Sequence, residues 1–399
     1  MRCLKHDRRL SRGLMAACLL AGLAAAAHAW EGFDHETWRE IAQPEPPRLQ
    51  TPQAGRLDLA PLLLADDGTT ISTADQWEEK RQRLRATLQA VIGEPTNLEP
   101  VAPAAHEVDR HADPDFERIH LMINADSDGG RIPAYLFLPL PAAQAPLPAV
   151  IVLHQTVAQG KEEPAGVNMS YDLNFAEDLA RRGLITIAYD APGFGERIPP
   201  GTDPYHNSHD FFRRHPDWSV LGRMNWDFSR IVDFLQTRPE VDPERIAVIG
   251  HSHGAYGGVM GAVFDPRVCA VVASCGINTF RADPTPWRWS HATPLLPRLG
   301  FFTDDIRTAP FDWHEVLACL APRPFFYFGT LADDIFPNTD GLRDVFEQVR
   351  GVYALYDAPA LLRLYLVDGP HSFPPDRQNL AYDWLERTLG VKGEPAHSP

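Results

Sequence analysis

From residue 149 onward, short and continuous apolar runs alternate with segments of helical spacing. Six runs stand out, at residues 149–153, 184–189, 246–249, 268–273, 325–328 and 361–367. Segments that favour helices lie near residues 174–182, 226–237, 255–263, 339–349 and 377–389. Because a continuously apolar strand needs cover on both faces, the alternation predicts a mostly parallel sheet with helices on each side.

Upstream of residue 149 the pattern is different. Four apolar residues recur at helical spacing within residues 76–92, and Gly93-Glu94-Pro95 ends this predicted helix. Residues 116–123 and 134–138 predict two strands, and the turn between them at 126–130 makes the pair antiparallel. The expected fold class is therefore α/β, with about eight strands in one mostly parallel sheet.

The pattern also divides the chain into regions. Residues 30–115 predict a Pro-rich and helical N-terminal extension, and residues 116–390 predict the main α/β domain. Within that domain the helix–strand rhythm breaks over residues 276–320, which are rich in Pro, Trp and Phe. We expect this stretch to form a cap at one rim of the sheet. Residues 30–75 are only weakly patterned, and their role is not predicted.

Residues 1–29 predict a secretory signal peptide. Basic residues precede an apolar run at 14–27, and Ala27-His28-Ala29 fits the small-x-small rule for cleavage after Ala29. A membrane anchor is the alternative, but the run of about 14 residues is short against the about 20 that a bilayer requires. The expected mature chain begins at Trp30 and is periplasmic or secreted.

Composition narrows the expected partners. The 399 residues include 37 basic and 53 acidic residues, a formal charge of −16, and removal of residues 1–29 lowers the charge to −20. Nucleic acids and anionic membranes attract basic surfaces, so neither is an expected partner. Cys269, Cys275 and Cys319 remain, which leaves a Cys269–Cys275 or a Cys275–Cys319 disulfide open. The oligomeric state is not predicted.

The sequence Gly250-His251-Ser252-His253-Gly254 predicts a nucleophile. It follows an apolar run and precedes a helical segment, which is the strand–turn–helix setting of a G-x-S-x-G elbow. Glycines permit the sharp turn, and the helix N-terminus favours negative charge on the Ser252 oxygen. The alternative is a Gly-rich turn that holds an incidental serine.

A serine nucleophile needs a base, and the base needs an acid that orients it. In this architecture the chain order is serine, acid, histidine. The loop after residues 325–328 carries two candidate acids. Asp333 is favoured because it stands four residues before Pro337, and Asp334 is the alternative. His371 follows the last apolar run and is the candidate base.

Three further features belong to the predicted site. The oxyanion of ester hydrolysis needs two backbone N–H donors, which we expect from His253 and from Gln155 in the loop after residues 149–153. Trp287 and Trp289 either stack against sugar rings of a substrate or form the core of the cap. Histidines cluster near the site, but no ligand spacing supports a metal.

Further stretches carry a family resemblance: Leu153-His154-Gln155-Thr156, Tyr189-Asp190-Ala191-Pro192-Gly193-Phe194-Gly195-Glu196 and Ala321-Pro322-Arg323-Pro324. With the elbow, they resemble the α/β-hydrolase superfamily, in particular the dienelactone-hydrolase-like and acetyl-xylan-esterase-like branch of secreted bacterial esterases. The resemblance covers residues 76–390 and implies cofactor-free ester hydrolysis through Ser252, Asp333 and His371. Dienelactone hydrolases carry Cys where this chain has Ser252. Glucuronoyl esterases carry Arg where this chain has His253, and this departure argues against a uronate ester as the substrate.

The expected function is that of a secreted serine carboxylic-ester hydrolase, acting on short-acyl, acetyl-type esters of carbohydrate. A serine peptidase or amidase of the same fold is the alternative, although such peptidases usually carry a large propeller that the N-terminal extension is too short to hold. A non-catalytic binding protein is a third hypothesis. Such proteins typically lose a member of the triad, and all three are present here. The acyl length and the alcohol partner are not predicted.

Overall fold

The computed structural model describes residues 58–143, 145–168 and 173–391. The expected signal peptide, its cleavage site after Ala29 and most of the weakly patterned stretch at 30–75 lie outside the described residues. Within the described part of the chain, no helix has the length and apolar character needed to span a membrane.

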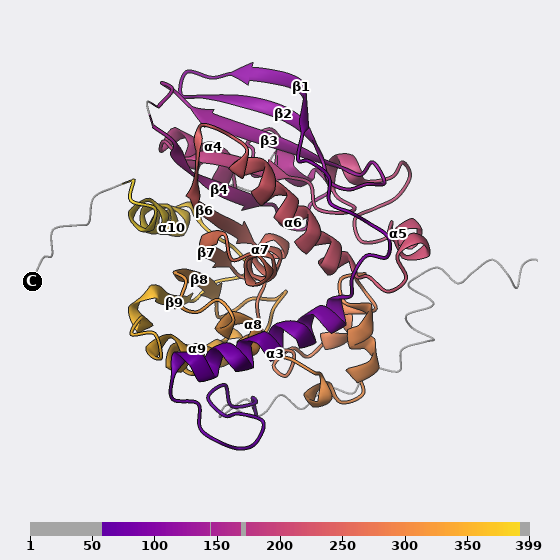
Figure 1. The fold of residues 1–399 in the computed structure, drawn as a ribbon, viewed down its shortest axis with the longest axis vertical. Coiled ribbons are helices and arrows are strands. Elements are labelled where there is room, and N and C mark those ends of the chain that lie inside the picture. Colours follow the sequence, from indigo (N-terminus) through magenta and orange to yellow (C-terminus); the bar gives the residue numbers. More distant parts are fainter. Residues whose placement is uncertain (1–57, 144, 169–172, 392–399) are drawn as a thin grey trace, which may run out of the picture. The chain divides into compact units, whose positions relative to one another are not determined.

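One nine-stranded sheet organises the described chain (Figure 1). Its strands are β1 (Ala105–Ala112), β2 (Phe116–Asn124), β3 (Arg131–Pro139), β4 (Leu147–Leu153), β5 (Ile185–Tyr189), β6 (Val241–His251), β7 (Val268–Ser274), β8 (Phe325–Thr330) and β9 (Leu362–Val367). Their order in the sheet is β1-β2-β3-β5-β4-β6-β7-β8-β9. Strands β1 and β2, β2 and β3, and β3 and β5 pair antiparallel, and all other neighbouring strands pair parallel. This confirms the expected hairpin and the mostly parallel sheet.

The apolar pattern does not predict strand β1. All eight of its residues are exposed, and Val108 is its one large apolar side chain. Alternation of apolar residues marks a strand only where one face is buried. An uncovered edge strand has no such face, and β1 is held by hydrogen bonds to β2, with Ala105 opposite Ile123 and Ala112 opposite Glu117. The sheet therefore has nine strands rather than about eight.

Helices cover both faces of the sheet, as expected. They are α3 (Ala74–Ile92), α4 (Phe175–Arg181), α5 (His209–Arg214), α6 (Val220–Gln236), α7 (His253–Phe264), α8 (Trp313–Ala318), α9 (Leu342–Ala354) and α10 (Pro375–Thr388). Helices α4 and α10 share one apolar cluster with Ala247 and Ile249 of β6. The intervening residue Val248 points to the other face, where it meets Gly258 of α7. The short helices α5 and α8 have too few turns to show a helical period in the sequence.

Residues 276–320 contain α8 and three short 3₁₀ helices, η3 (Pro286–Trp289), η4 (Pro297–Phe302) and η5 (Ile306–Thr308). An aromatic cluster holds this stretch together. The ring of Phe280 lies 5.4 Å from that of Phe311 and 6.0 Å from that of Trp289, and Trp289 lies 5.5 Å from Trp313. All four side chains are buried, so most aromatic residues of the stretch form its core.

The three described cysteines are free thiols. Cys269 lies in β7 and Cys275 directly follows that strand. Six residues of extended chain span about 20 Å, whereas a disulfide needs Cα atoms within about 7 Å. The Cys269–Cys275 pairing is therefore wrong, and Cys275 and Cys319 are each buried without a bond between them.

Candidate active site

Strand β6 ends at His251 and helix α7 begins at His253, so Ser252 occupies the turn between them. Its backbone angles, φ 54° and ψ −114°, are strained for a residue with a side chain. Glycines make the turn possible: a Cβ on Gly254 would lie 2.3 Å from the carbonyl oxygen of Leu153, and one on Gly276 would lie 2.2 Å from that of Ser252. The geometry is that of the predicted nucleophile elbow.

A cavity of about 540 Å³ opens in front of this turn. Its walls are formed by Gln155, Thr156, Tyr205, Ser252, Tyr256, Arg288, Trp289, Thr293, Leu295, Asp334, Ile335, Phe336 and His371. They come from the loops that follow β4, β5, β6, β8 and β9, from helix α7 and from residues 276–320. The carboxyl ends of parallel strands meet at one edge of a sheet, so this edge brings the predicted residues Ser252, His371 and Gln155 together.

His371 and Asp333 form a hydrogen-bonded pair. Nδ1 of His371 lies 2.8 Å from Oδ2 of Asp333. The other carboxylate oxygen, Oδ1, accepts the backbone N–H groups of Ile335 and Phe336 at 2.9 and 2.7 Å. Burial by itself would raise the pKa of Asp333, but the hydrogen bonds and the charge of His371 hold that pKa below its ordinary value. The carboxylate is thus ionised and can fix the imidazole with Nε2 free to act as a base.

The structure distinguishes the two neighbouring acids. Asp333 is 4% exposed and bonded to His371, whereas the side chain of Asp334 is exposed at the wall of the cavity. This difference comes from the turn after β8, in which the Asp333 carboxylate accepts the backbone N–H groups of Ile335 and Phe336, two and three residues further along the chain. The geometry favours Asp333 over Asp334 as the acid.

The groups behind the pair are neutral. His251 is buried 4.8 Å from the ring of His371, and burial followed by the charge of His371 lowers the pKa of His251 to about 3. Burial raises the pKa of the Cys275 thiol to about 12. Ligand atoms of Cys275, Asp333 and His371 lie within 4.8 Å of one another, and within this group Nδ1 of His371 and Oδ2 of Asp333 are hydrogen-bonded to each other.

The predicted oxyanion donors lie on two elements. His253 is the first residue of α7, so its backbone N–H has no acceptor within the helix. Its ring points elsewhere: it packs 4.8 Å from Phe194, 5.2 Å from Tyr256 and 5.5 Å from His154. Burial holds the pKa of His253 well below its ordinary value, so this imidazole is uncharged. Only the main chain of His253 is available for the oxyanion.

Gln155 lines the cavity and is held from behind by buried groups. Its side-chain Nε2 donates to Oε1 of Glu163 at 2.9 Å, and its carbonyl oxygen accepts from Nδ1 of His154 at 2.6 Å. Nε2 of His154 in turn accepts the backbone N–H of Ala191 at 3.1 Å. Both ring nitrogens of His154 therefore have hydrogen-bond partners, and His154 holds the loop after β4 in place.

Glu163 is a buried acid in this support. It is fully buried, its Oε2 has no hydrogen-bond partner, and burial raises its pKa to about 7. Between pH 4.5 and about 7 the folded chain therefore holds a proton on Glu163 that the unfolded chain has lost. Stability contributed by the neutral acid is present below pH 4.5 and is lost as the pH rises to about 7.

Glu163→Gln is therefore expected to stabilise the protein at alkaline pH. The neutral amide avoids the buried charge, so at pH 8 the free energy of unfolding should exceed that of wild type by about 3 kcal/mol. At pH 4.5 the two proteins should agree within about 1 kcal/mol. Urea unfolding at both pH values measures this difference.

Glu162→Gln is the matched control, since Glu162 is adjacent and only partly buried. It should show no such dependence on pH. If the Glu163→Gln protein were less stable than wild type at pH 8, the buried Glu163 carboxylate would not destabilise the folded protein as argued above.

The sequence did not single out several residues that form the cavity walls. The Tyr205 hydroxyl lies 3.0 Å from both the Thr156 and the Tyr256 hydroxyls. Arg288 pairs with Asp283 at 2.7 Å, and its guanidinium stacks 4.5 Å from the centre of the Phe336 ring. No motif marks these residues because their elements meet only in the folded chain. The one available signal was the position of Arg288 between two tryptophans.

Those two tryptophans differ in position. Trp289 lines the cavity, although it is 3% exposed and packs 4.9 Å from Tyr256. Trp287 is not among the described residues that line the cavity. Of the two tryptophans, Trp289 borders the cavity, and it does so as a buried ring with 3% of its surface exposed.

Comparisons with known proteins identify relatives. The family described as "Glucuronyl esterase, fungi" matches residues 123–355. Putative hydrolase YtaP of Bacillus subtilis (strain 168) is 25% identical over 69% of this chain and 88% of its own length. The 4-O-methyl-glucuronoyl methylesterase 1 of Wolfiporia cocos (strain MD-104) is 26% identical over 66% of this chain and 64% of its own length.

A solved structure shares the fold. The glucuronoyl esterase from Solibacter usitatus superposes with a TM-score of 0.68 and 17% identity, over 84% of this chain and 99% of that chain. This likeness confirms the expected α/β-hydrolase fold, and the family match confirms the resemblance to esterases.

Proposed function

This chain belongs to the glucuronyl esterase family, and we propose that it hydrolyses uronic acid esters of carbohydrate through Ser252, His371 and Asp333. That it is a carboxylic ester hydrolase follows from the family. The observation that carries the proposed mechanism is the meeting of three parts at one cavity. These are the strained turn at Ser252, the His371 imidazole and the buried Asp333 carboxylate bonded to it.

The proposed reaction is acyl transfer in two steps. His371 takes the hydroxyl proton of Ser252 as Oγ attacks the ester carbonyl, and the oxyanion accepts backbone N–H groups of His253 and Gln155. The C–O bond to the alcohol then breaks, and His371 returns the proton to the leaving oxygen. In the second step water, deprotonated by His371, hydrolyses the acyl-enzyme and frees Ser252. Asp333 keeps the imidazole in the required tautomer throughout.

The family revises the substrate that the sequence suggested. The sequence alone favoured an acetyl-type ester, in which the sugar is the alcohol. In a uronoyl ester the sugar supplies the acyl group, and the acyl pocket must hold a polar ring. The cation among the described residues that line the cavity is Arg288, which Asp283 and Phe336 hold in place. A fixed guanidinium suits the hydroxyl groups of a sugar better than it suits a methyl group.

A substrate panel tests this proposal. Purified protein should release methanol from the methyl ester of glucuronate with a kcat/KM at least about tenfold above that for acetate release from acetylated xylan oligosaccharides. Ser252→Ala run in parallel shows that any release depends on the proposed nucleophile. Faster release of acetate would overturn the uronoyl assignment in favour of the acetyl ester. Cleavage of a peptide amide without cleavage of either ester would support the peptidase or amidase alternative.

We also propose that the mature chain acts after export from the cytoplasm. The support for export is the basic and apolar pattern of residues 1–29, which lie outside the described residues. N-terminal sequencing of the protein from culture supernatant or periplasm should begin at Trp30.

A further inference from the structure

Three hydroxyl groups form a chain at the wall of the candidate active-site cavity. The Tyr205 hydroxyl lies in the middle, 3.0 Å from the Thr156 hydroxyl and 3.0 Å from the Tyr256 hydroxyl. All three side chains line the cavity that holds Ser252. Thr156 directly follows Gln155, and Tyr256 lies one turn of α7 after Ser252. The hydroxyl chain therefore joins the loop after β4 to helix α7, the two elements that carry the predicted oxyanion donors.

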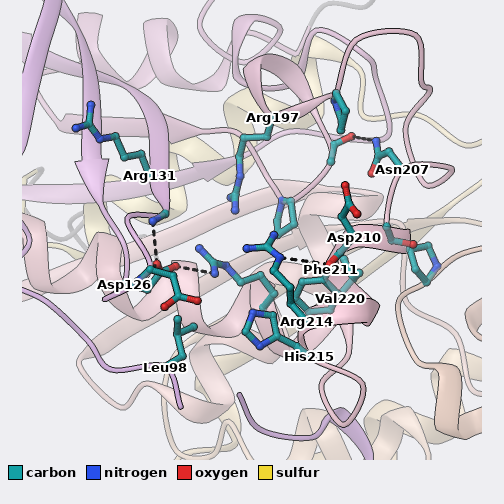
Figure 2. Close-up of a pocket in the computed structure, with 18 of the residues that line it drawn as sticks. Leu98, Asp126, Arg131, Arg197, Asn207, Asp210, Phe211, Arg214, His215 and Val220 are labelled. Carbon is teal, nitrogen blue, oxygen red and sulfur yellow. Dashed lines mark hydrogen bonds and ion pairs between the residues drawn. The ribbon is translucent and has the colours of Figure 1, made fainter. Parts of the chain in front are cut away.

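Tyr205 occupies a strained position between two cavities. Its backbone φ of 65° is in the left-handed region, which a residue with a bulky side chain rarely adopts. Tyr205 also lines a second cavity, of about 480 Å³ (Figure 2), so this side chain borders two open spaces. Asn207 holds the loop by donating from Nδ2 to the Gly193 carbonyl at 3.0 Å (Figure 2), and Phe194 packs perpendicular to the Tyr205 ring at 5.2 Å. A strained conformation that its surroundings maintain marks a candidate functional residue.

The hydroxyl chain has one more donor than it uses internally. Burial raises the pKa of Tyr205 and of Tyr256, so both phenols keep their protons at neutral pH. The three hydroxyls thus hold three protons, and the two hydrogen bonds between them use two of these protons. None of the other residues that the structure describes hydrogen-bonds to these hydroxyls. One O–H group and several oxygen lone pairs therefore remain for water or for a molecule bound in the cavity.

These groups match a hydroxylated ligand. A sugar hydroxyl donates one hydrogen bond and accepts others, so it can pair with the remaining O–H and with a lone pair of the hydroxyl chain. Arg288 lines the same cavity and adds N–H donors, and its charge acts on both Tyr205 and Tyr256. An acyl group without hydroxyls would displace water from these polar groups and leave them unpaired, which weakens its binding.

We propose that Tyr205, through this hydroxyl chain, determines specificity for an ester whose acyl group is a hydroxylated ring and discriminates against a ring without hydroxyls. The inference rests on the proposed function and deepens it, because it assigns recognition of the sugar ring to named residues. Tyr205 fixes the two outer hydroxyls, and the chain binds ring hydroxyls of the uronic acid while Ser252 attacks the ester carbonyl. Proton transfer in the reaction stays with His371.

Steady-state hydrolysis of two methyl esters tests the inference. Methyl cyclohexanecarboxylate has a six-membered ring like that of methyl glucuronate but carries no hydroxyl. Wild type should favour methyl glucuronate by at least about 100-fold in kcat/KM. Tyr205→Phe removes the middle hydroxyl and should lower kcat/KM for methyl glucuronate about tenfold, while that for methyl cyclohexanecarboxylate changes by less than about threefold. The selectivity between the two esters, which a purely structural defect would leave unchanged, should thus narrow by about tenfold.

Thr156→Val is the second variant, since it removes one end of the hydroxyl chain and keeps the branched shape of the side chain. It should narrow the selectivity in the same direction, so the test stands even if Tyr205→Phe disturbs its strained loop. Tyr353→Phe is the matched control, because its hydroxyl donates to the Arg323 carbonyl at 2.7 Å and Tyr353 is not among the described residues that line the cavity. This control should keep the wild-type selectivity.

Two results would overturn the inference. The first is a wild type that does not favour methyl glucuronate over methyl cyclohexanecarboxylate. The second is wild-type selectivity in both Tyr205→Phe and Thr156→Val, whatever the rates. A wild type that hydrolyses neither methyl ester would refute the proposed function itself, and the inference would fall with it. Failure of the hydroxyl chain is thereby distinguishable from failure of the proposed function.

Discussion

Ser252→Ala is expected to lower kcat for methyl glucuronate hydrolysis by about 10⁵-fold while the protein stays folded. Without Oγ no acyl-enzyme forms, and neither His371 nor the oxyanion donors can replace that covalent step. The substitution removes one oxygen from a strained turn that glycines already shape, so the fold should persist. Single-turnover and steady-state rates measure the loss, and a fluorophosphonate probe should label wild type but not the variant.

Ser372→Ala serves as the control for Ser252→Ala. Ser372 is the neighbour of His371, and its hydroxyl donates to the Pro370 carbonyl at 3.0 Å. It should retain most of the activity and the labelling by the probe. A Ser252→Ala rate within about tenfold of wild type would contradict the assignment of the nucleophile.

Asp333→Asn is expected to lower kcat by about 10³- to 10⁴-fold. An amide has a single, neutral oxygen in place of the two carboxylate oxygens. With its N–H₂ group turned toward His371, the amide would force the imidazole proton from Nδ1 to Nε2. Nε2 would then face the nucleophile as a donor instead of an acceptor. The amide oxygen would still accept the backbone N–H groups of Ile335 and Phe336, which keeps the N–H₂ group on the side of His371. The expected signature is a large fall in kcat with a small change in KM.

Asp334→Asn is the matched control, because the two acids are adjacent in the chain and only Asp333 contacts His371. It should stay within about tenfold of wild type in kcat. If Asp334→Asn were the more damaging of the two, the acid would have to be reassigned to Asp334, the alternative that the sequence left open.

The elbow shows which parts of the site a sequence can reveal. Ser252 and its glycines are contiguous, and steric limits on a strand–turn–helix connection demand small residues at fixed offsets. The order serine, acid, histidine follows from topology, because each catalytic loop follows a particular strand. The choice between Asp333 and Asp334 needed the structure, because the direction of each side chain depends on one turn.

The cavity walls show the opposite case. Tyr205, Tyr256 and Arg288 come from segments that are distant in the chain, and each has an ordinary local sequence. The expected role for Trp287 came from composition alone. In the structure Trp289 lines the cavity, and Trp287, two residues earlier, is not among the described residues that do so. Composition does not report which side of a short helix faces a site.

The sequence by itself determined the parallel sheet, the strand–helix alternation, the elbow at Ser252 and the candidates for base and acid. These depend on hydrophobic periodicity and on steric limits, which act between near neighbours in the chain. The tertiary structure decided the exposed strand β1, the free thiols, the burial of Glu163 and the two cavities that share Tyr205. These depend on which distant segments come into contact, and such contacts leave no period or motif in the chain.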